Sequence, residues 1–236
     1  MKRLLVFLAV VGLTTMFTFG QKKEVRPVSD FTGIEASSLF NITVIKGSTT
    51  SLTIETSDEV MARVKSEVRD GVLHLHLVDN PEGHKSSEIK KLNAIIVMNN
   101  LEKVTLSGIT KLTSKDLFTP ESFKGDISDI SSMIINVNTK QLCINMLGIS
   151  KVKINAEVLD KAELNSSGIS KISGKLIADS VIINSRGANT IKLKGQAGVL
   201  HTLNDAKSSN APLIKYKHKR RMSIGANDRK RFTKIK

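Results

Sequence analysis

The stretch Ser167-Gly168-Ile169-Ser170-Lys171-Ile172 returns along the chain at intervals of about twenty residues. Close copies occupy residues 107–112 and 147–152, and looser copies occupy residues 128–133 and 186–191. With the glycine position as the marker, the copies stand at residues 108, 129, 148, 168, 187, 207 and 225. Such regular spacing is typical of a solenoid, in which each repeat forms one turn of chain stacked on the turn before it.

A second column of related residues lies three positions before the glycine position. Its members are Thr105, Asp126, Asn145, Asn165, Asn184, Asn204 and Met222. A stacked side-chain amide can donate to one neighbouring turn and accept from the other, which satisfies polar groups at a buried corner. We therefore predict that both columns are structural. The predicted ladder consists of Asn145, Asn165, Asn184 and Asn204, and the predicted turn glycines are Gly108, Gly148, Gly168 and Gly187.

The residues that precede each asparagine alternate between apolar and other types. The residues directly before the four asparagines are apolar: Ile144, Leu164, Ile183 and Leu203. Those two residues further back are mostly apolar: Leu142, Ala162, Val181 and His201. A period of two indicates strands, and no repeat contains a helix-forming stretch long enough for a leucine-rich-repeat horseshoe. The chain is thus predicted to be all-β and to fold as a parallel β-helix with aliphatic columns inside. Glycine serves the corners that need a positive φ.

Residues 28–103 lack the repeat but contain alternating segments at residues 41–45, 51–55 and 72–77. Residues 46–50 are predicted to connect two strands of a hairpin, and Asp70-Gly71 is predicted to form a second turn. No long linker interrupts the sequence. We expect one β-helical domain over residues 28–236, with N-terminal strands at 28–103, repeat rungs at 104–227 and a basic closing segment at 212–236.

A short helix is predicted after residue 56. Ser57 precedes Asp58 and Glu59 in an arrangement that suits a helix N-terminus. Val60, Val64 and Val68 then fall on one helical face.

The first twenty residues have the features of a secretory signal peptide. Basic residues at 2–3 precede an apolar run at 4–13. The small residues Thr18 and Gly20 occupy the positions −3 and −1 that a signal peptidase recognises before its cleavage site. We expect cleavage after Gly20, which leaves residues 21–27 as a short N-terminal segment; an uncleaved anchor is the alternative. No later segment approaches the roughly 20 apolar residues of a membrane-spanning helix, so none is expected in the mature chain.

Composition argues against most pocket chemistry. Trp is absent and aromatics are 4% of residues, so stacking platforms for bases or sugars are scarce. A single cysteine, Cys143, excludes an internal disulfide and a Cys-rich zinc site. His74 and His76 share a strand face, but no third ligand stands at a diagnostic spacing. We expect no metal and no cofactor.

Catalytic constellations are not evident either. The carboxylates are scattered, and the serine column at Ser131, Ser150, Ser170 and Ser209 has no recurring histidine beside it, so it is interpreted as a polar corner. We expect no catalytic residues. A carbohydrate-active lyase or hydrolase built on a β-helix stays open as an alternative, as does a purely structural envelope protein.

Positive charge is concentrated at the C-terminal end. The net charge is +14, and residues 212–236 hold ten Lys or Arg and one acid. One interpretation is a patch that binds anionic ligands, and the other is protection of the last rung against end-to-end stacking. The patch residues are Lys215, Lys217, Lys219, Arg220, Arg221, Arg229, Lys230 and Arg231. Lys111, Lys151 and Lys171 recur at one repeat position, which is either a ligand groove or a solvated face.

Residues 27–233 resemble a family of exported bacterial proteins described as "putative auto-transporter adhesin, head GIN domain". The resemblance depends on residues 31–34 and 41–44, on residues 70–73, on the Ser-Gly pairs at 107–108 and 167–168, and on a closing strand at 214–217. Asp129 and Lys207 depart from it at glycine positions, as does the basic closing segment. The resemblance implies a right-handed β-helical domain with an adhesin-like role and no known chemistry.

We therefore expect a non-catalytic module of the bacterial periplasm or cell surface. Its expected partners are anionic glycans, lipopolysaccharide or the envelope surface, because export makes nucleic acid a poor candidate.

Overall fold

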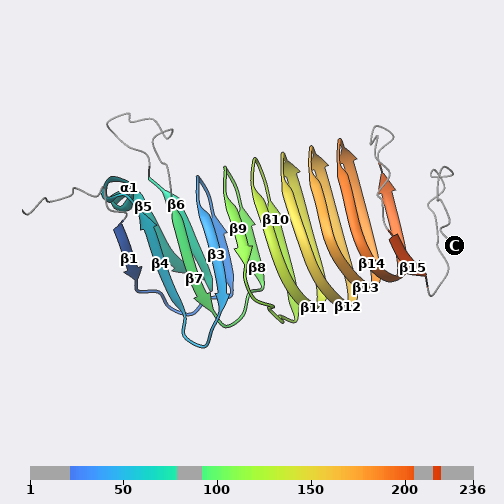
Figure 1. Ribbon diagram of the computed structural model, residues 1–236, viewed down its shortest axis with the longest axis horizontal. Helices are drawn as coiled ribbons and strands as arrows, with labels where there is room; N and C mark the ends of the chain where they lie inside the picture. The colour runs from blue at the N-terminus through green and yellow to red at the C-terminus, as the bar shows by residue number, and fades with distance from the viewer. Residues whose placement is uncertain (1–21, 79–91, 205–214, 219–236) are drawn as a thin grey trace, which may run out of the picture.

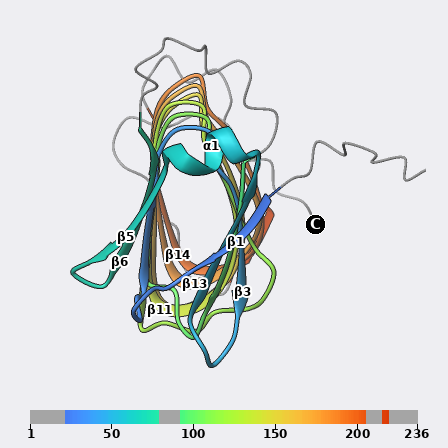
Figure 2. The same cartoon turned by 90° about the vertical axis from the view of Figure 1, so that its left-hand side faces the viewer.

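The protein folds as a β-solenoid, which confirms the predicted β-helix (Figure 1). The computed structural model describes residues 22–78, 92–204 and 215–218, with only the backbone of Asn204 and of residues 215–218. The predicted signal peptide therefore lies outside the described residues, as do Lys207 and Gly225. Seen end on, the turns superimpose as a flattened ring with two long walls (Figure 2). The right-handed sense of the coil stays a prediction.

The two walls are formed by separate short strands at the N-terminal end. The first wall has the order β1 (Lys22–Arg26), β4 (Ser51–Thr56), β7 (Asn93–Met98), β3 (Asn41–Lys46) and β9 (Lys111–Ser114). The second wall has the order β5 (Val64–Arg69), β6 (Val72–Leu77), β2 (Gly33–Ala36), β8 (Lys103–Leu106) and β10 (Ser122–Ile127). Pairing is parallel except at the N-terminal margin, where β1 with β4, β4 with β7 and β5 with β6 are antiparallel.

Later turns are continuous strands that bend from one wall into the other. These are β11 (Ser132–Gly148), β12 (Lys151–Gly168), β13 (Lys171–Gly187) and β14 (Thr190–Asn204), and β15 (Lys215–His218) pairs with the first half of β14. The register between β11 and β12 shifts between Thr139 and Gln141, where the strand passes into the second wall. Each long strand thus contributes its first half to the first wall and its second half to the second wall.

The core consists of aliphatic columns that run along the solenoid axis. Ile144, Leu164 and Ile183 are paired in successive turns and have no exposed surface. On the first wall Met133, Val152 and Ile172 form an equivalent column. Because successive strand residues point to opposite faces, the residues directly before and after each core residue in the chain point outward on every turn.

Two N-terminal predictions were wrong. Residues 46–50 do not close a hairpin, because β7 lies between β3 and β4 and pairs with both. The helix α1 (Asp58–Arg63) ends before Val64, which begins β5. Val64 and Val68 then pair with β6 across the Asp70-Gly71 turn, which forms as predicted and has positive φ at both residues. Val60 and Met61 of α1 are buried, so the helix packs on the N-terminal end of the core.

The glycine column forms the turn between the second and first walls. Gly108, Gly148, Gly168 and Gly187 all have positive φ, as does Asp129. Asp129 keeps the turn because its φ of +58° lies in the left-handed region that aspartate tolerates, and its carboxylate accepts a hydrogen bond from the Gly108 N–H at 2.8 Å. The departure from glycine therefore leaves the local geometry unchanged.

The serine column lies just past these turns and is a buried polar corner. Ser131, Ser150 and Ser170 are 2–3% exposed. The Ser150 hydroxyl donates to the Leu147 carbonyl at 2.6 Å, and the Ser170 hydroxyl donates to Asn189 Oδ1. Ser209 lies outside the described residues.

The asparagine ladder connects three turns and ends on a carboxylate. Asn184 Nδ2 donates to Asn165 Oδ1 at 2.6 Å, and Asn165 Nδ2 donates to Asn145 Oδ1 at 2.9 Å. Asn145 Nδ2 then donates to Asp126 Oδ1 at 2.7 Å. Every donor along the column therefore points the same way, with the anionic acceptor at the N-terminal end.

Asn204 does not continue this ladder, which corrects the sequence-based prediction. Its backbone pairs with Ser185, and Leu203 takes the position beside Asn184. The reason is that the step from β13 to β14 is 19 residues, which brings the buried Leu200 beside Val181. A slip of one residue would exchange the inward and outward faces. Consequently Asn184 Oδ1 has no hydrogen-bond partner among the described residues, and Leu203 is 61% exposed.

Replacing Leu203 with asparagine is expected to extend the ladder. The new amide would donate to Asn184 Oδ1, and one buried hydrogen bond of this kind adds about 1 kcal/mol to the free energy of unfolding. Urea unfolding followed by circular dichroism measures the gain. Leu159→Asn is the control, since Leu159 is 72% exposed and has no ladder neighbour. Equal effects of the two substitutions would contradict the assignment.

Candidate binding surface

Six exposed lysines gather on the outward side of the first wall. They lie on the first halves of β12, β13 and β14, and we call them the lysine face: Lys151, Lys153, Lys171, Lys175, Lys192 and Lys194. They share one side because lysines at positions i and i+2 of a strand point the same way, as Lys151 with Lys153 and Lys192 with Lys194 do. The sequence contained this spacing, but repeat positions alone indicated only Lys151 and Lys171 together with Lys111.

Lysines of neighbouring turns lie directly opposite one another in this surface. Lys151 pairs with Lys171, and Lys175 pairs with Lys194. Adjacent strands are about 4.8 Å apart, so these side chains carry like charges at close range. Glu157 is an outward acid on this surface, and Asp160 and Asp179 are exposed at the corner where the strands leave the first wall.

Several lysines on the second wall and at its corner form ion pairs with carboxylates. There Lys124 pairs with Asp126 at 3.3 Å and Lys161 with Glu163 at 2.8 Å, while Lys140 near the corner pairs with Glu121 at 2.7 Å. The hydrogen bond from Lys161, followed by that from Asn165, lowers the pKa of Glu163. None of the ion pairs between described residues involves the lysine face. The lysine face therefore differs from Lys124, Lys140 and Lys161, whose ammonium groups already have carboxylate partners.

The predicted C-terminal patch is placed only in part. The backbones of Lys215 and Lys217 lie in β15, where Lys215 is paired with Lys194 and Lys217 with Gln196. This register continues the first wall beyond the lysine face by one strand. The other predicted patch residues lie outside the described part of the chain: Lys219, Arg220, Arg221, Arg229, Lys230 and Arg231.

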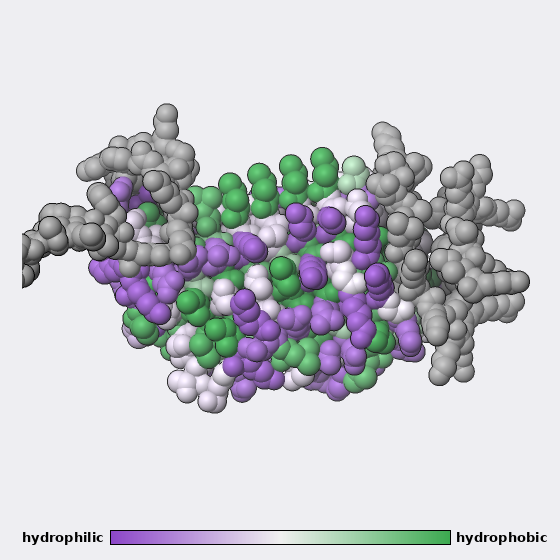
Figure 3. All heavy atoms as spheres, in the orientation of Figure 1, coloured by the Kyte–Doolittle hydropathy of each residue, from purple (hydrophilic) through white to green (hydrophobic). Residues whose placement is uncertain are grey.

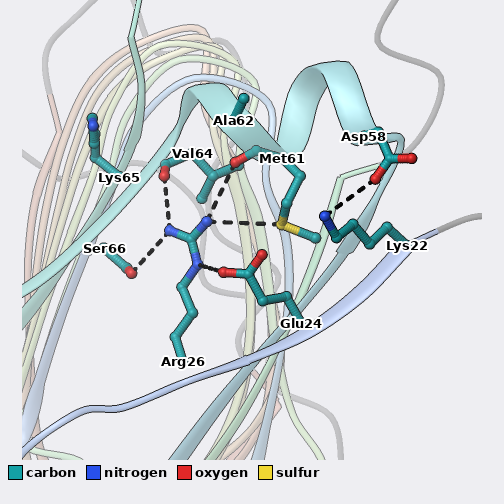
Figure 4. A pocket seen from close by; sticks show the side chains of 9 residues that line it. All are labelled: Lys22, Glu24, Arg26, Asp58, Met61, Ala62, Val64, Lys65 and Ser66. Carbon is teal, nitrogen blue, oxygen red and sulfur yellow. Dashed lines mark hydrogen bonds and ion pairs between the residues drawn. The ribbon is translucent and has the colours of Figure 1, made fainter.

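A shallow pocket of about 410 Å³ lies at the opposite end, beside α1 and β1 (Figure 4). Its central side chain is Arg26, which donates to the Val64 carbonyl at 2.7 Å, the Met61 carbonyl at 3.3 Å and Ser66 Oγ at 3.2 Å. Arg26 also pairs with Glu24 at 3.0 Å. The guanidinium is thus occupied by contacts that hold β1 against the helix and β5, so the pocket is best explained as structural.

The other side chains that could bind a metal or act as a nucleophile are isolated from one another or already hydrogen-bonded. Among the described residues, no three His, Cys, Asp or Glu side chains converge as a metal site would require. His74 faces Glu35 at 3.6 Å. Partial burial, and secondarily the charge of Glu163, raises the pKa of the Cys143 thiol, whose Sγ lies 3.8 Å from Asn145 Oδ1. The neutral thiol is a poor nucleophile.

Comparison with known proteins identifies the family. The family model described as "Putative auto-transporter adhesin, head GIN domain" matches residues 30–199. The chain belongs to this family. No curated protein matches it. In the described residues, the helix is too short to cross a bilayer.

Solved structures of similar fold share little sequence with this member of the family. One described as a putative adhesin from Parabacteroides merdae is 16% identical with a TM-score of 0.59, covering 86% of this chain and 95% of its own. Another putative adhesin, from Parabacteroides distasonis, is 15% identical with a TM-score of 0.60, covering 87% and 94%. A protein from the same species described as a putative lipid binding protein is 12% identical with a TM-score of 0.51, covering 86% and 95%. At these identities the likeness shows a common fold.

Proposed function

We propose that this protein is a non-catalytic, adhesin-like binding module of the bacterial cell envelope, and that the lysine face binds anionic groups of glycans or lipid headgroups. The observation that carries the proposal is the direct pairing of lysines in neighbouring turns, Lys151 with Lys171 and Lys175 with Lys194, none of which forms an ion pair with another described residue. Like charges placed opposite each other in a sheet lower stability. An anion with several charges removes this repulsion on binding, so the arrangement favours a multivalent ligand.

The rigid scaffold suits such a ligand. Parallel pairing fixes successive turns about 4.8 Å apart, so the cations form an ordered array along the axis. The backbone of β15 continues the first wall by one strand beyond the lysine face. Ligands with phosphate, sulfate or carboxylate groups share the chemistry required, and binding should weaken as salt is added.

Several observations support a role without catalysis. Asp126 and Glu163 on the second wall both have partners: Asp126 contacts Asn145 and Lys124, and Glu163 contacts Lys161 and Asn165. Structures of similar fold are described as adhesins and, in one case, as a lipid binding protein. The family's description as an auto-transporter adhesin domain favours export, to which removal of residues 1–20 would contribute.

The test compares retention on an immobilised anionic polysaccharide, such as dextran sulfate, with retention on neutral dextran over a salt gradient. The variant Lys171→Gln/Lys175→Gln/Lys194→Gln is expected to bind the anionic polymer about tenfold more weakly, because each exposed charge contact contributes roughly 0.5 kcal/mol. Binding of the unaltered protein should fall steeply with salt.

The matched control removes three charges from the paired lysines, as Lys124→Gln/Lys140→Gln/Lys161→Gln. Both variants carry the same net charge, so a general charge effect would weaken them equally. Equal weakening, or equal retention on the charged and neutral polymers, would overturn the proposal. A chain ending at His218 separates the contribution of the basic closing segment.

A further inference from the structure

A row of exposed isoleucines runs along one edge of the solenoid. Each follows a residue with positive φ at the turn between the walls, and the row forms the isoleucine ridge: Ile109, Ile130, Ile149 and Ile169, which are 57%, 57%, 58% and 60% exposed. Figure 3 shows the row as apolar knobs that stand above the upper margin, where the long strands of Figure 1 end.

The backbone holds these residues in register. The Ile130 N–H donates to the Gly108 carbonyl at 2.9 Å, the Ile149 N–H to the Asp129 carbonyl at 2.8 Å, and the Ile169 N–H to the Gly148 carbonyl at 2.9 Å. Three steps of roughly 4.8 Å give a ridge about 14 Å long. Stacking shields each side chain only on the sides that face its neighbours, so more than half of each remains in water. Contiguous exposed apolar surface of this kind commonly marks an interaction site.

Cations flank the ridge. Lys111, Lys151 and Lys171 each come two residues after a ridge isoleucine and are the lysines nearest to it on the first wall. On the second wall Arg186 precedes the next turn, and Leu147, which is 61% exposed, adds apolar surface. The acid within the ridge turns, Asp129, is held by the Gly108 N–H. An apolar row bordered by Lys and Arg matches the layers of an anionic membrane surface.

A second copy of the chain fits this edge less well. A stable protein interface buries about 800 Å² on each partner, which a single convex row of side chains does not supply. Two ridges brought together would also place the flanking cations of both copies side by side. An anionic bilayer avoids both difficulties, because acyl chains conform to a narrow ridge and headgroup phosphates neutralise the lysines.

We propose that the isoleucine ridge inserts edge-on into the surface of an anionic lipid bilayer, with Lys111, Lys151 and Lys171 at the level of the headgroup phosphates. This rests on the proposed function, because the lysine face supplies the attraction that brings the protein to the surface. Insertion is shallow and reversible, since one row of side chains enters the lipid.

The absence of tryptophan from the chain permits a direct test. Ile149→Trp places a single fluorophore on the ridge, and Leu159→Trp places one at the opposite corner. With vesicles of equal parts phosphatidylglycerol and phosphatidylcholine, emission from the ridge tryptophan shifts to the blue and is quenched by lipids that carry a quencher in the acyl chain. Emission from the control tryptophan stays unchanged. Vesicles of phosphatidylcholine alone produce a much smaller shift.

A second pair of variants measures the strength of binding. Ile149→Ser/Ile169→Ser is expected to lower partitioning to the anionic vesicles about thirtyfold, since each serine removes roughly 1 kcal/mol of apolar transfer. Leu159→Ser/Leu203→Ser removes comparable exposed apolar surface elsewhere and should bind as the unaltered protein does. Both variants should keep their retention on dextran sulfate.

The outcomes separate this inference from the proposed function. Retention on dextran sulfate without a blue shift on anionic vesicles overturns the inference and leaves the proposed function standing. If the unaltered protein is not retained on dextran sulfate, the proposed function is overturned. Equal shifts on the anionic and zwitterionic vesicles overturn the role of the lysines. A dimer in sedimentation that the ridge serines dissociate, with unchanged vesicle binding, assigns the ridge to a second copy instead.

Discussion

Replacing Gly168 with alanine is expected to lower the free energy of unfolding by about 3 kcal/mol. Gly168 has a φ of +105°, outside the left-handed region that other residues tolerate. An added Cβ would lie 2.6 Å from the Gly148 carbonyl oxygen and 3.0 Å from the Gly148 nitrogen. These are backbone atoms of the turn below, so relief requires the stacked turns to separate.

Gly71→Ala is the control for this prediction. Gly71 also has a positive φ, of +71°, but nothing lies within 4 Å of the position of an added Cβ. This substitution should lower the free energy of unfolding by only about 1 kcal/mol, which is the cost of placing a non-glycine residue at positive φ. Urea unfolding of both variants, followed by circular dichroism, measures the difference. Equal losses would show that stacking of the turns contributes nothing to the requirement for glycine.

Replacing Asn165 with alanine is expected to lower the free energy of unfolding by about 2 to 3 kcal/mol. The Asn165 side chain donates to Asn145 Oδ1 at 2.9 Å and to Glu163 Oε1 at 3.2 Å, and it accepts from Asn184 Nδ2 at 2.6 Å. Alanine removes all three bonds. The amides on both neighbouring turns then lose a partner at a partly buried site, which costs more than the loss of an exposed bond.

Asn155→Ala provides the comparison within the same strand. Asn155 lies on the first wall and donates one exposed hydrogen bond, of 3.4 Å, to Asn136 Oδ1. Its loss should lower stability by less than about 0.5 kcal/mol. Thermal and urea unfolding of the two variants measure the two losses of stability, which can then be compared. If Asn165→Ala were as mild as Asn155→Ala, the ladder would be incidental to stability.

The stacked columns were predictable from the sequence because parallel turns place identical residues in contact. Asn145, Asn165 and Asn184 share a repeat position and are joined by hydrogen bonds in the structure. The same logic failed for Asn204. There the repeat was too degenerate to reveal that the step into β14 is 19 residues, and the burial of Leu200 determines the register instead.

The N-terminal strands were harder to predict because their partners lie far apart in the chain. β3 and β4 are consecutive, yet β7, about 40 residues beyond β4, lies between them. Likewise Val64 and Val68 suited a helical face, but pairing with β6 draws them into a strand. Local propensity was overruled by long-range pairing in both cases.

The lysine face was only partly visible in the sequence. Lys153 and Lys192 share a repeat column that Ser173 interrupts, and Lys175 lies in a different column, paired with Asn155 on one side and Lys194 on the other. They come together because every second residue of a strand faces the same way, whichever column it occupies.

The order of residues alone thus determined the period of the coil, its aliphatic interior and the positions where glycine is needed, because each of these follows from contacts repeated at a constant spacing. The tertiary structure decided which cations find a carboxylate and which do not, and it placed Ile109, Ile130, Ile149 and Ile169 in solvent rather than in the core. The physical reason is that partnership and exposure depend on which wall and which side of a turn a side chain occupies, and this is set only when the turns are stacked.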